Sequence, residues 1–345
     1  MTVNDFLTKN IILPPGCSAR PGKLADYLLA FELVNTYSRH INGRDDLTDA
    51  ELVRLDWQNE DFNPETDLHL VFTQQGVMIG MVECWLDSHP PVHPWNWVCV
   101  HPDYLDSNLW EYLLTWSENR SRAALDLAPA EFRVAPHTGT EHHNFAGTDA
   151  IRKLGWKHVR SYYRMEVNLD SQPLVPPIPA GIVIRPYHPE TETEAVYNTF
   201  VDSFKDHYGF VAQPFEHGFA NFKHNMIDEP GYDPNFWFVA VDGDTIAGIC
   251  ICRPVSAEDP KGGWVSELGV RRAWRKKGLG TLLLKTAFAA FYERGQKRAG
   301  LGVDASSLTG ALRLYEQAGM HVSRQYDNFE KELRSGQELA TQELA

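Results

Sequence analysis

The chain has 345 residues, of which 46 are acidic and 32 are Lys or Arg, so its net charge is −14 at neutral pH. Its length favours two domains over one hydrophobic core, and its 43 % hydrophobic and 23 % charged residues are typical of a soluble globular protein. The acidic balance argues against nucleic acid as a partner, and the apolar stretches fall short of the ~20 residues that a membrane-spanning helix needs.

The cysteines and the N-terminus indicate a cytoplasmic protein. Five cysteines are scattered along the chain without a Cys-x-x-Cys pair, which is typical of reduced thiols. The first residues lack the basic start and apolar core of a signal peptide. The histidines lack the spacing of a metal site on a helix, so we expect no metal.

A proline-rich segment separates two halves. Residues 170–181 carry four prolines between two apolar strands, which indicates an extended, semi-rigid linker. We therefore predict one domain over residues 1–170, a linker at 171–180 and a second domain over residues 181–333. The polar segment 334–345 is predicted to fray or to form a loose helix.

The second half alternates strands and helices. Apolar residues such as Val196, Phe200 and Phe204 recur on one side of an amphipathic helix. Asp242-Gly243 predicts a hairpin turn between two strands. In chain order, we expect a strand at 182–185, helices at 192–204 and 214–227, strands at 236–241, 245–253 and 264–270, a helix at 279–294, a strand at 299–304, a helix at 310–318 capped by residues 306–309, and a strand at 320–329.

The loop after the strand 264–270 concentrates positive charge. Five of the seven residues from Arg271 to Lys277 are Arg or Lys, in a chain that is acidic as a whole. Gly278-Leu-Gly280 then opens a helix, whose free N–H groups and dipole favour an anion. Glycine also lets a ligand approach the backbone closely. The pattern predicts a phosphate-binding turn, with a glycine turn that binds nothing as the alternative.

Arg275-Lys-Lys-Gly278-Leu-Gly280 resembles the R-x-x-G-x-G/A loop that holds the pyrophosphate of acetyl-CoA in the GCN5-related N-acetyltransferase (GNAT) family. It is neither a P-loop nor a complete dinucleotide fingerprint. Downstream, the segment from Ala311 to Met320 resembles the family signature A-x-x-L-Y-x-x-x-G-F. The resemblance covers residues 181–333. It implies an α/β fold with a mixed, mostly antiparallel twisted sheet flanked by helices, and CoA in a gap between two splayed strands.

An altered copy of the loop lies in the first half. When Val100 is placed on Val270 without gaps, residues 105–110 fall on the phosphate loop, and residues 150–156 fall on 314–320. The replacements are Leu105 for Arg275, Asp106 for Lys276, Asn108 for Gly278, Trp110 for Gly280 and Ile151 for Tyr315. We interpret residues 1–170 as a degenerate GNAT-like domain of a tandem protein. Chance similarity is the alternative.

The resemblance implies roles for particular residues. The backbone of Leu268, Gly269 and Val270 is expected to bond the pantetheine arm of acetyl-CoA. Ser307, which stands where many family members have Asn, is a further expected contact. Tyr315 is expected to lie near the sulfur as general acid. The residues expected to hold the pyrophosphate, chiefly through backbone amides, are Arg275, Lys276, Lys277, Gly278, Leu279, Gly280 and Thr281.

The base and the acceptor contacts are less defined. Glu267 is the candidate base, because a partly buried carboxylate near the end of the strand can take the proton of an amine. The alternatives are a carboxylate paired with an Arg, and, for Tyr315, a core tyrosine without a catalytic role. The segment Asp206-His207-Tyr208 follows a helix that borders the acceptor cleft in the family, so these residues are candidate acceptor contacts.

These features predict an N-acetyltransferase that transfers an acetyl group from acetyl-CoA to the primary amine of a small-molecule or peptide acceptor. The chemistry is expected in the second domain. A non-catalytic acyl-CoA sensor and an interaction scaffold are the alternatives. Intact Tyr315 and Glu267 argue against the sensor, and the basic loop argues against the scaffold. The sequence leaves open the acceptor, the acyl chain and the choice between monomer and homodimer.

Overall fold

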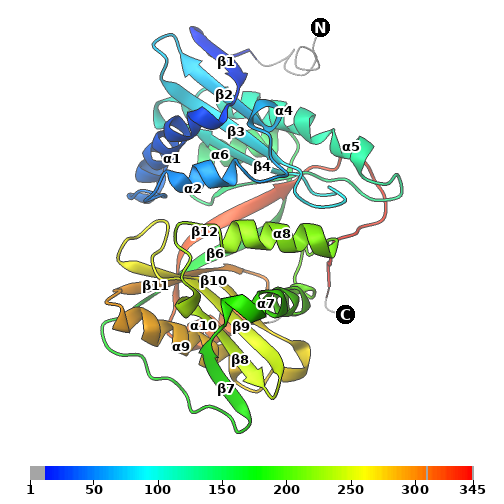
Figure 1. Ribbon diagram of the computed structural model, residues 1–345. Coiled ribbons are helices and arrows are strands. Elements are labelled where there is room, and N and C mark those ends of the chain that lie inside the picture. Colours follow the sequence, from blue (N-terminus) through cyan, green and yellow to red (C-terminus); the bar gives the residue numbers. More distant parts are fainter. Residues whose placement is uncertain (1–11, 308–309, 344–345) are drawn as a thin grey trace. The chain divides into compact units, whose positions relative to one another are not determined.

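The computed structural model describes residues 12–307 and 310–343 (Figure 1). The chain divides into unit 1, which comprises Met1–Ser161 and Tyr326–Leu339, and unit 2, which comprises Tyr162–Gln325 and Ala340–Ala345. The divisions fall inside two long strands, β6 (Lys157–Asn168) and β12 (His321–Glu330). The expected linker at 171–180 lies within unit 2, because the last strand of each half crosses from one unit to the other.

Unit 1 is a sheet with helices on both faces. The strand order is β1-β2-β3-β4-β5-β12, antiparallel except for the parallel pair β4–β5. Met81 packs with α1, whereas Gly80 contacts α4, because successive strand residues point to opposite faces. The elements are β1 (Cys17–Pro21), α1 (Tyr27–Asn42), α2 (Glu51–Asp56), α3 (Pro64–Asp67), β2 (Leu68–Thr73), β3 (Met78–Trp85), β4 (Trp95–Val100), the 3₁₀ turn η3 (Pro102–Tyr104), α4 (Leu109–Ser121), α5 (Ala124–Leu127), β5 (His137–Glu141) and α6 (Phe145–Lys153).

Unit 2 has the same construction. Its strand order is β6-β11-β10-β9-β8-β7, antiparallel except for the parallel pair β10–β11. Cys250 and Phe238 pack with α9 on one face, and Ile249 and Val239 pack with α7 and α8 on the other. The elements are β7 (Ile182–Pro186), α7 (Pro189–Phe204), α8 (Phe215–Met226), β8 (Trp237–Asp242), β9 (Thr245–Arg253), β10 (Gly262–Val270), the 3₁₀ turn η5 (Arg272–Trp274), α9 (Leu279–Glu293), β11 (Arg298–Asp304) and α10 (Ala311–Gln317).

The two halves of the chain repeat one order of elements. In each half, a strand and helices are followed by three antiparallel strands, a 3₁₀ turn, a long helix and a strand–helix–strand segment. The turn and helix η3–α4 of unit 1 correspond to η5–α9 of unit 2, as the gap-free alignment of Val100 with Val270 requires. The tandem arrangement is therefore confirmed, and the similarity between the halves is not chance.

The strands β10 and β11 separate after a short paired stretch. Their register extends only from Gly262–Arg298 to Val265–Leu301, while β10 continues to Val270. A β-bulge between Val265 and Glu267 marks the point of separation, and pairing with β9 continues to Val270. The partners of β10 among the described residues are β9 and β11. The edge of β10 that faces β11 is therefore unpaired towards Val270. This is the gap that the family resemblance implied.

The C-terminal segment pairs with unit 1. Residues 334–337, expected to fray or to form a loose helix, instead bridge residues 132–134 of unit 1, with Val134 N donating to Arg334 O at 2.9 Å.

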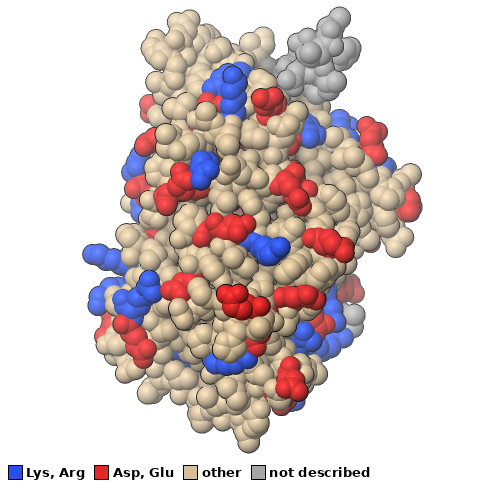
Figure 2. Space-filling view, viewed as in Figure 1, with Lys and Arg blue, Asp and Glu red and all other residues tan. Residues whose placement is uncertain are grey.

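On the face displayed in Figure 2, Lys and Arg side chains are interspersed with Asp and Glu. Of the helices in the described part of the chain, none is both long and apolar enough to cross a membrane.

Candidate active site

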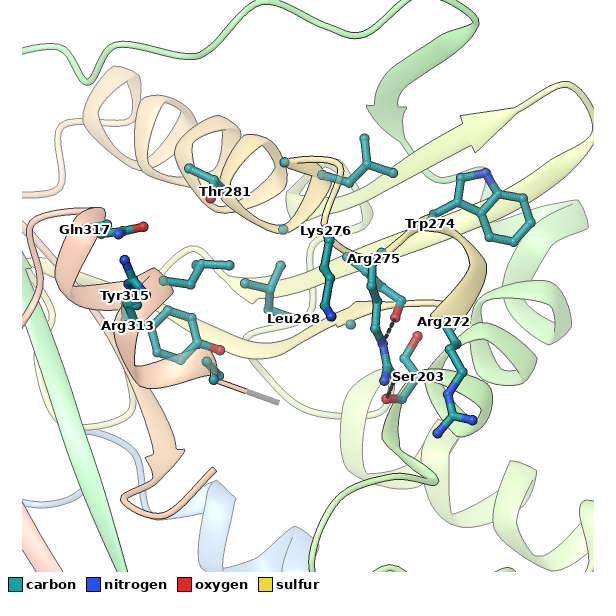
Figure 3. A pocket seen from close by; sticks show the side chains of 18 of the residues that line it. Ser203, Leu268, Arg272, Trp274, Arg275, Lys276, Thr281, Arg313, Tyr315 and Gln317 are labelled. Atoms are coloured by element: carbon teal, nitrogen blue, oxygen red, sulfur yellow. Dashed lines mark hydrogen bonds between the residues drawn. The ribbon is translucent and has the colours of Figure 1, made fainter. Parts of the chain in front are cut away.

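A cavity of about 980 Å³ lies in unit 2 where β10 ends (Figure 3). It is bounded by the end of β10, the basic loop, the first turn of α9, the end of α7 and the helix α10. The sequence-predicted site residues that line it are Leu268, Gly269, Val270, Arg275, Lys276, Gly278, Leu279, Gly280, Thr281 and Tyr315. Two distant motifs therefore meet around one cavity.

The first turn of α9 is built to receive an anion. Gly278 is its N-cap with φ +81°, a left-handed conformation that glycine adopts without strain. The first helical hydrogen bond runs from Leu282 N to Gly278 O at 3.0 Å, so the N–H groups of residues 279–281 precede the helical ladder. A Cβ on Gly280 would lie 3.0 Å from Leu314 Cδ1, so a large side chain there would enter the space between α9 and α10.

Arg275 holds the loop to α7. Its Nε donates to Val270 O at 3.0 Å, its Nη2 to Ser203 O at 3.0 Å and its Nη1 to Asp206 Oδ2 at 2.6 Å. Asp206, which is buried, also accepts from Arg272 Nη2 at 3.0 Å. Asp206 thus pairs with the loop, although its position after α7 suggested an acceptor contact. The guanidinium of Arg275 fixes the loop, which leaves anion binding to backbone amides and other cations.

Other cations surround the cavity. Lys276 lines it, has φ +61° and is exposed. Figure 3 shows Arg313 and Gln317 on α10 across the cavity from Lys276. Lys277 was expected to hold the pyrophosphate, but it is not among the residues that line the cavity in the described part of the chain. Sequence reasoning missed Arg313 and Gln317, because only the packing of α10 turns them towards this space.

Tyr315 and Glu267 have perturbed acidities. Tyr315 is 7 % exposed, and burial, with smaller effects of Cys250 and Glu267, raises the pKa of its phenol. Glu267 is partly exposed, yet burial of its carboxyl raises its pKa to about 8, against the opposing charge of Arg253. Tyr315 lines the cavity, whereas Glu267 is not among the described residues that line it, although the next residue, Leu268, is. A carboxyl and a phenol with raised pKa values are candidates for proton transfer.

Ser307 lies apart from these groups. Its N–H donates to Asp304 O at 3.0 Å, and it is not among the described residues that line the cavity. The N-cap of α10 is Gly310, with φ +75° and no side-chain cap. Two residues of the expected cap, Leu308 and Thr309, lie outside the described residues.

Comparison with known proteins identifies the family of the domain that holds the cavity. Residues 193–320 match the family model of the acetyltransferase (GNAT) family. A GCN5-related N-acetyltransferase from Sphaerobacter thermophilus has a similar structure, with a TM-score of 0.78 and 29 % identity, covering 96 % of this chain and 100 % of that chain. Residues 193–320 form a GNAT domain, and the whole chain is similar to a tandem GNAT structure.

This GNAT protein is an acyltransferase with a tandem layout. A mycothiol acetyltransferase from Salinispora arenicola is 26 % identical over 299 residues, which cover 84 % of this chain and 88 % of the relative. A tandem GNAT protein from the clavulanic acid biosynthesis pathway shares the fold, with a TM-score of 0.65 and 14 % identity over 93 % of this chain and 100 % of that chain. The family and the mixed, mostly antiparallel fold expected from two motifs are confirmed.

The corresponding place in unit 1 of this GNAT protein is filled. Trp110, which aligns with Gly280, is 1 % exposed and belongs to the first turn of α4. A Cβ on Gly147 of α6 would lie 3.0 Å from Trp110 Cζ2. The indole therefore packs against α6, where α9 and α10 of unit 2 border the cavity.

Two residues, one in the last turn of α7 and one just after this helix, line the cavity without belonging to a sequence motif. Ser203 lines the cavity and is 3 % exposed, and its Oγ has no hydrogen-bond partner among the described residues. His207 also lines the cavity, and burial, followed by the charge of Arg275, lowers its pKa. His207 was a candidate acceptor contact, whereas Ser203 was missed because a serine in an amphipathic helix carries no distinguishing pattern.

Proposed function

We propose that unit 2 of this acyltransferase transfers an acetyl group from acetyl-CoA to the primary amine of a small-molecule or peptide acceptor. In the sequence division, the chemistry belongs to the domain at residues 181–333. The observation that supports this most directly is the cavity itself, because it brings the first turn of α9, the unpaired end of β10 and the buried Tyr315 together.

The cavity fits an acyl-CoA donor. The free N–H groups at Leu279–Thr281 suit a diphosphate, and the absence of a Cβ at Gly278 lets it approach them. Lys276 adds positive charge, and Arg275 keeps the loop in place through Asp206. The unpaired edge at Leu268–Val270 offers backbone groups to an extended arm that carries amides.

Glu267 and Tyr315 suit the two proton transfers. In the reaction the amine nitrogen bonds to the thioester carbonyl carbon and the carbon–sulfur bond breaks, so one proton leaves nitrogen and one joins sulfur. Glu267, with a pKa of about 8, is partly ionised near neutral pH and takes the first proton. Tyr315, whose pKa is raised, stays protonated and donates the second. Binding both reactants in one cavity supplies much of the rate.

Unit 1 is proposed to support unit 2 without chemistry of its own. Trp110 fills the space that corresponds to the cavity, and Leu105 and Asp106 replace two basic residues of the loop. The sequence division at residues 1–170 is proposed as this degenerate domain.

Calorimetric titration with acetyl-CoA tests the proposal. The expected result is one site per chain, which Gly280→Trp abolishes, because the indole would fill the cavity as Trp110 fills its counterpart. Gly280→Ala is the matched control, since its Cβ meets the flexible end of Leu314 at 3.0 Å and is in ordinary contact with Val270 Cγ2 at 3.9 Å, so it should leave binding intact. Absence of binding by the wild type would refute the proposal, and two sites would refute the assignment of unit 1. Release of free thiol from acetyl-CoA in a screen of amines would then identify the acceptor.

A further inference from the structure

The unpartnered hydroxyl of Ser203 sits against the strand β10. A Cβ on Gly269 would lie 2.8 Å from Ser203 Cβ and 3.1 Å from Ser203 Oγ. Glycine at 269 therefore allows α7 to approach the strand closely. Gly269 belongs to the stretch whose edge is left unpaired where β10 and β11 separate. Figure 3 shows Ser203 beside Arg275 at the border of the cavity.

The lack of a partner is not a general property of hydroxyls on this helix. Thr199, one turn earlier and also buried, donates its hydroxyl to Ala195 O at 2.8 Å and accepts from Arg271 Nη2 at 3.0 Å. Ser203 could satisfy itself in the same way through the carbonyl of residue 199. It does not, although its own carbonyl is held by Arg275 Nη2 at 3.0 Å. A buried hydroxyl that borders a cavity without a partner is placed for a ligand.

The position along β10 indicates which part of the ligand it meets. Gly280 and Thr281 in the first turn of α9 line the part of the cavity that suits a diphosphate, and Glu267, the proposed base, precedes on β10 the residues that line the cavity. Gly269 lies between Glu267 and the end of β10 that leads to α9, and Ser203 packs against Gly269. The part of an acyl-CoA that joins the diphosphate to the thioester is the pantetheine arm, which carries amide groups. A serine hydroxyl both donates and accepts, so it suits an amide.

We propose that the Ser203 hydroxyl is a positioning residue that hydrogen-bonds an amide of the pantetheine arm of the acyl donor. The inference rests on the proposed function, because it requires an acyl-CoA in this cavity. It predicts that Ser203→Ala keeps or raises the stability of the free protein but lowers its affinity for acetyl-CoA. In the free protein, Ser203→Ala removes an unsatisfied buried group, so stability should be unchanged or higher. In the complex, it leaves an amide of the ligand without a partner, so affinity should fall.

The test compares two ligands by titration. For Ser203→Ala, the dissociation constant of acetyl-CoA should rise about fivefold to tenfold, the effect of one hydrogen bond. That of adenosine 3′,5′-bisphosphate, which has phosphates but no arm, should stay at the wild-type value. With an amine acceptor, KM for acetyl-CoA should rise while kcat is kept. Ser203→Cys, which keeps the volume with a weaker hydrogen-bonding group, should fall between wild type and Ser203→Ala.

The outcomes separate the two proposals. If the wild type binds acetyl-CoA and Ser203→Ala binds it equally well, the role of Ser203 is refuted and the proposed function stands. Equal weakening of both ligands would also refute it, because the residue would then act on the phosphate end or on the fold. If the wild type binds neither ligand, the proposed function itself fails. Should Ser203→Ala not fold, unchanged acetyl-CoA affinity in Ser203→Cys would overturn the inference.

Discussion

Asp206→Asn tests whether one buried carboxylate holds the phosphate loop. Asp206 is 4 % exposed and accepts hydrogen bonds from Arg275 Nη1 at 2.6 Å and Arg272 Nη2 at 3.0 Å. In the variant, the half-exposed guanidinium of Arg272 can be hydrated by solvent. Arg275 keeps its hydrogen bonds to Val270 O and Ser203 O but loses the negative charge of Asp206. Because a hydrogen bond to a charged group contributes about 1.5–3 kcal/mol, we expect the free energy of unfolding to fall by about 2–3 kcal/mol.

Asp202→Asn is the matched control for this experiment. Asp202 lies on the same helix, but its side chain is 34 % exposed and pairs with Lys205, which is 50 % exposed. Such a surface pair contributes about 0–1 kcal/mol. Thermal unfolding of the ligand-free protein should show a fall of about 5–10 °C for Asp206→Asn and a much smaller one for Asp202→Asn. Equal losses in the two variants would refute the reasoning.

The pH dependence of the Asp206 contribution has a defined sign. Burial opposes ionisation of Asp206, but the hydrogen bond from Arg275 and the charges of Arg275 and Arg272 lower its pKa overall. A carboxyl with a lowered native pKa stabilises the fold above its unfolded pKa of about 3.9, and this contribution is lost as pH falls through the native value. The stability difference between wild type and Asp206→Asn should be constant from about pH 5 to 8 and shrink below about pH 4. A difference that grows on acidification would contradict the assignment.

Three further predictions concern turnover and the loop. Tyr315→Phe should lower kcat about 10²–10⁴-fold, the range for a general acid, with little change in the dissociation constant of acetyl-CoA, and equal turnover would remove Tyr315 from the mechanism. Because a base must be deprotonated, the wild-type kcat/KM should rise with pH up to the pKa of Glu267, at about 8. Glu267→Gln should lose this rise, and an unchanged rise in the variant would assign it to another group. Gly278→Ala should lower the free energy of unfolding by about 1–2 kcal/mol, because alanine is strained at φ +81°. Gly302→Ala, whose Cβ meets nothing within 4 Å, should lower the free energy of unfolding far less. Equal stability of the two variants would argue against backbone strain at Gly278.

Local pattern was sufficient for most elements around the site. The expected helix at 279–294 is α9, Leu279–Glu293, and the expected strand at 264–270 is contained in β10, Gly262–Val270. The helix expected at 192–204 begins earlier, at Pro189, because proline fits the first turn and leaves no helical hydrogen bond unmade. Apolar periodicity and glycine stops act within a few residues, so they can be recognised without the fold.

Pairing between distant residues could not be predicted in the same way. The motif pattern suggested that Arg275 contacts phosphate, whereas its guanidinium binds Ser203 and Asp206, about 70 positions earlier in the chain. The exchange of β6 and β12 between units is likewise invisible in the sequence, because the proline-rich segment at 171–180 marks a change of composition and not a change of strand partner.

The sequence by itself determined the family, the repeat and the loop that opens α9, because glycines and basic residues at fixed spacing act through the local backbone. The tertiary structure decided which side chains meet around the cavity. The raised pKa values of Glu267 and Tyr315 arise from burial, and the hydroxyl of Ser203, which lies where α7 packs closely on Gly269, has no partner among the described residues. Burial and hydrogen-bond partners depend on contacts between segments that are remote in the chain, so they exist only once the fold has formed.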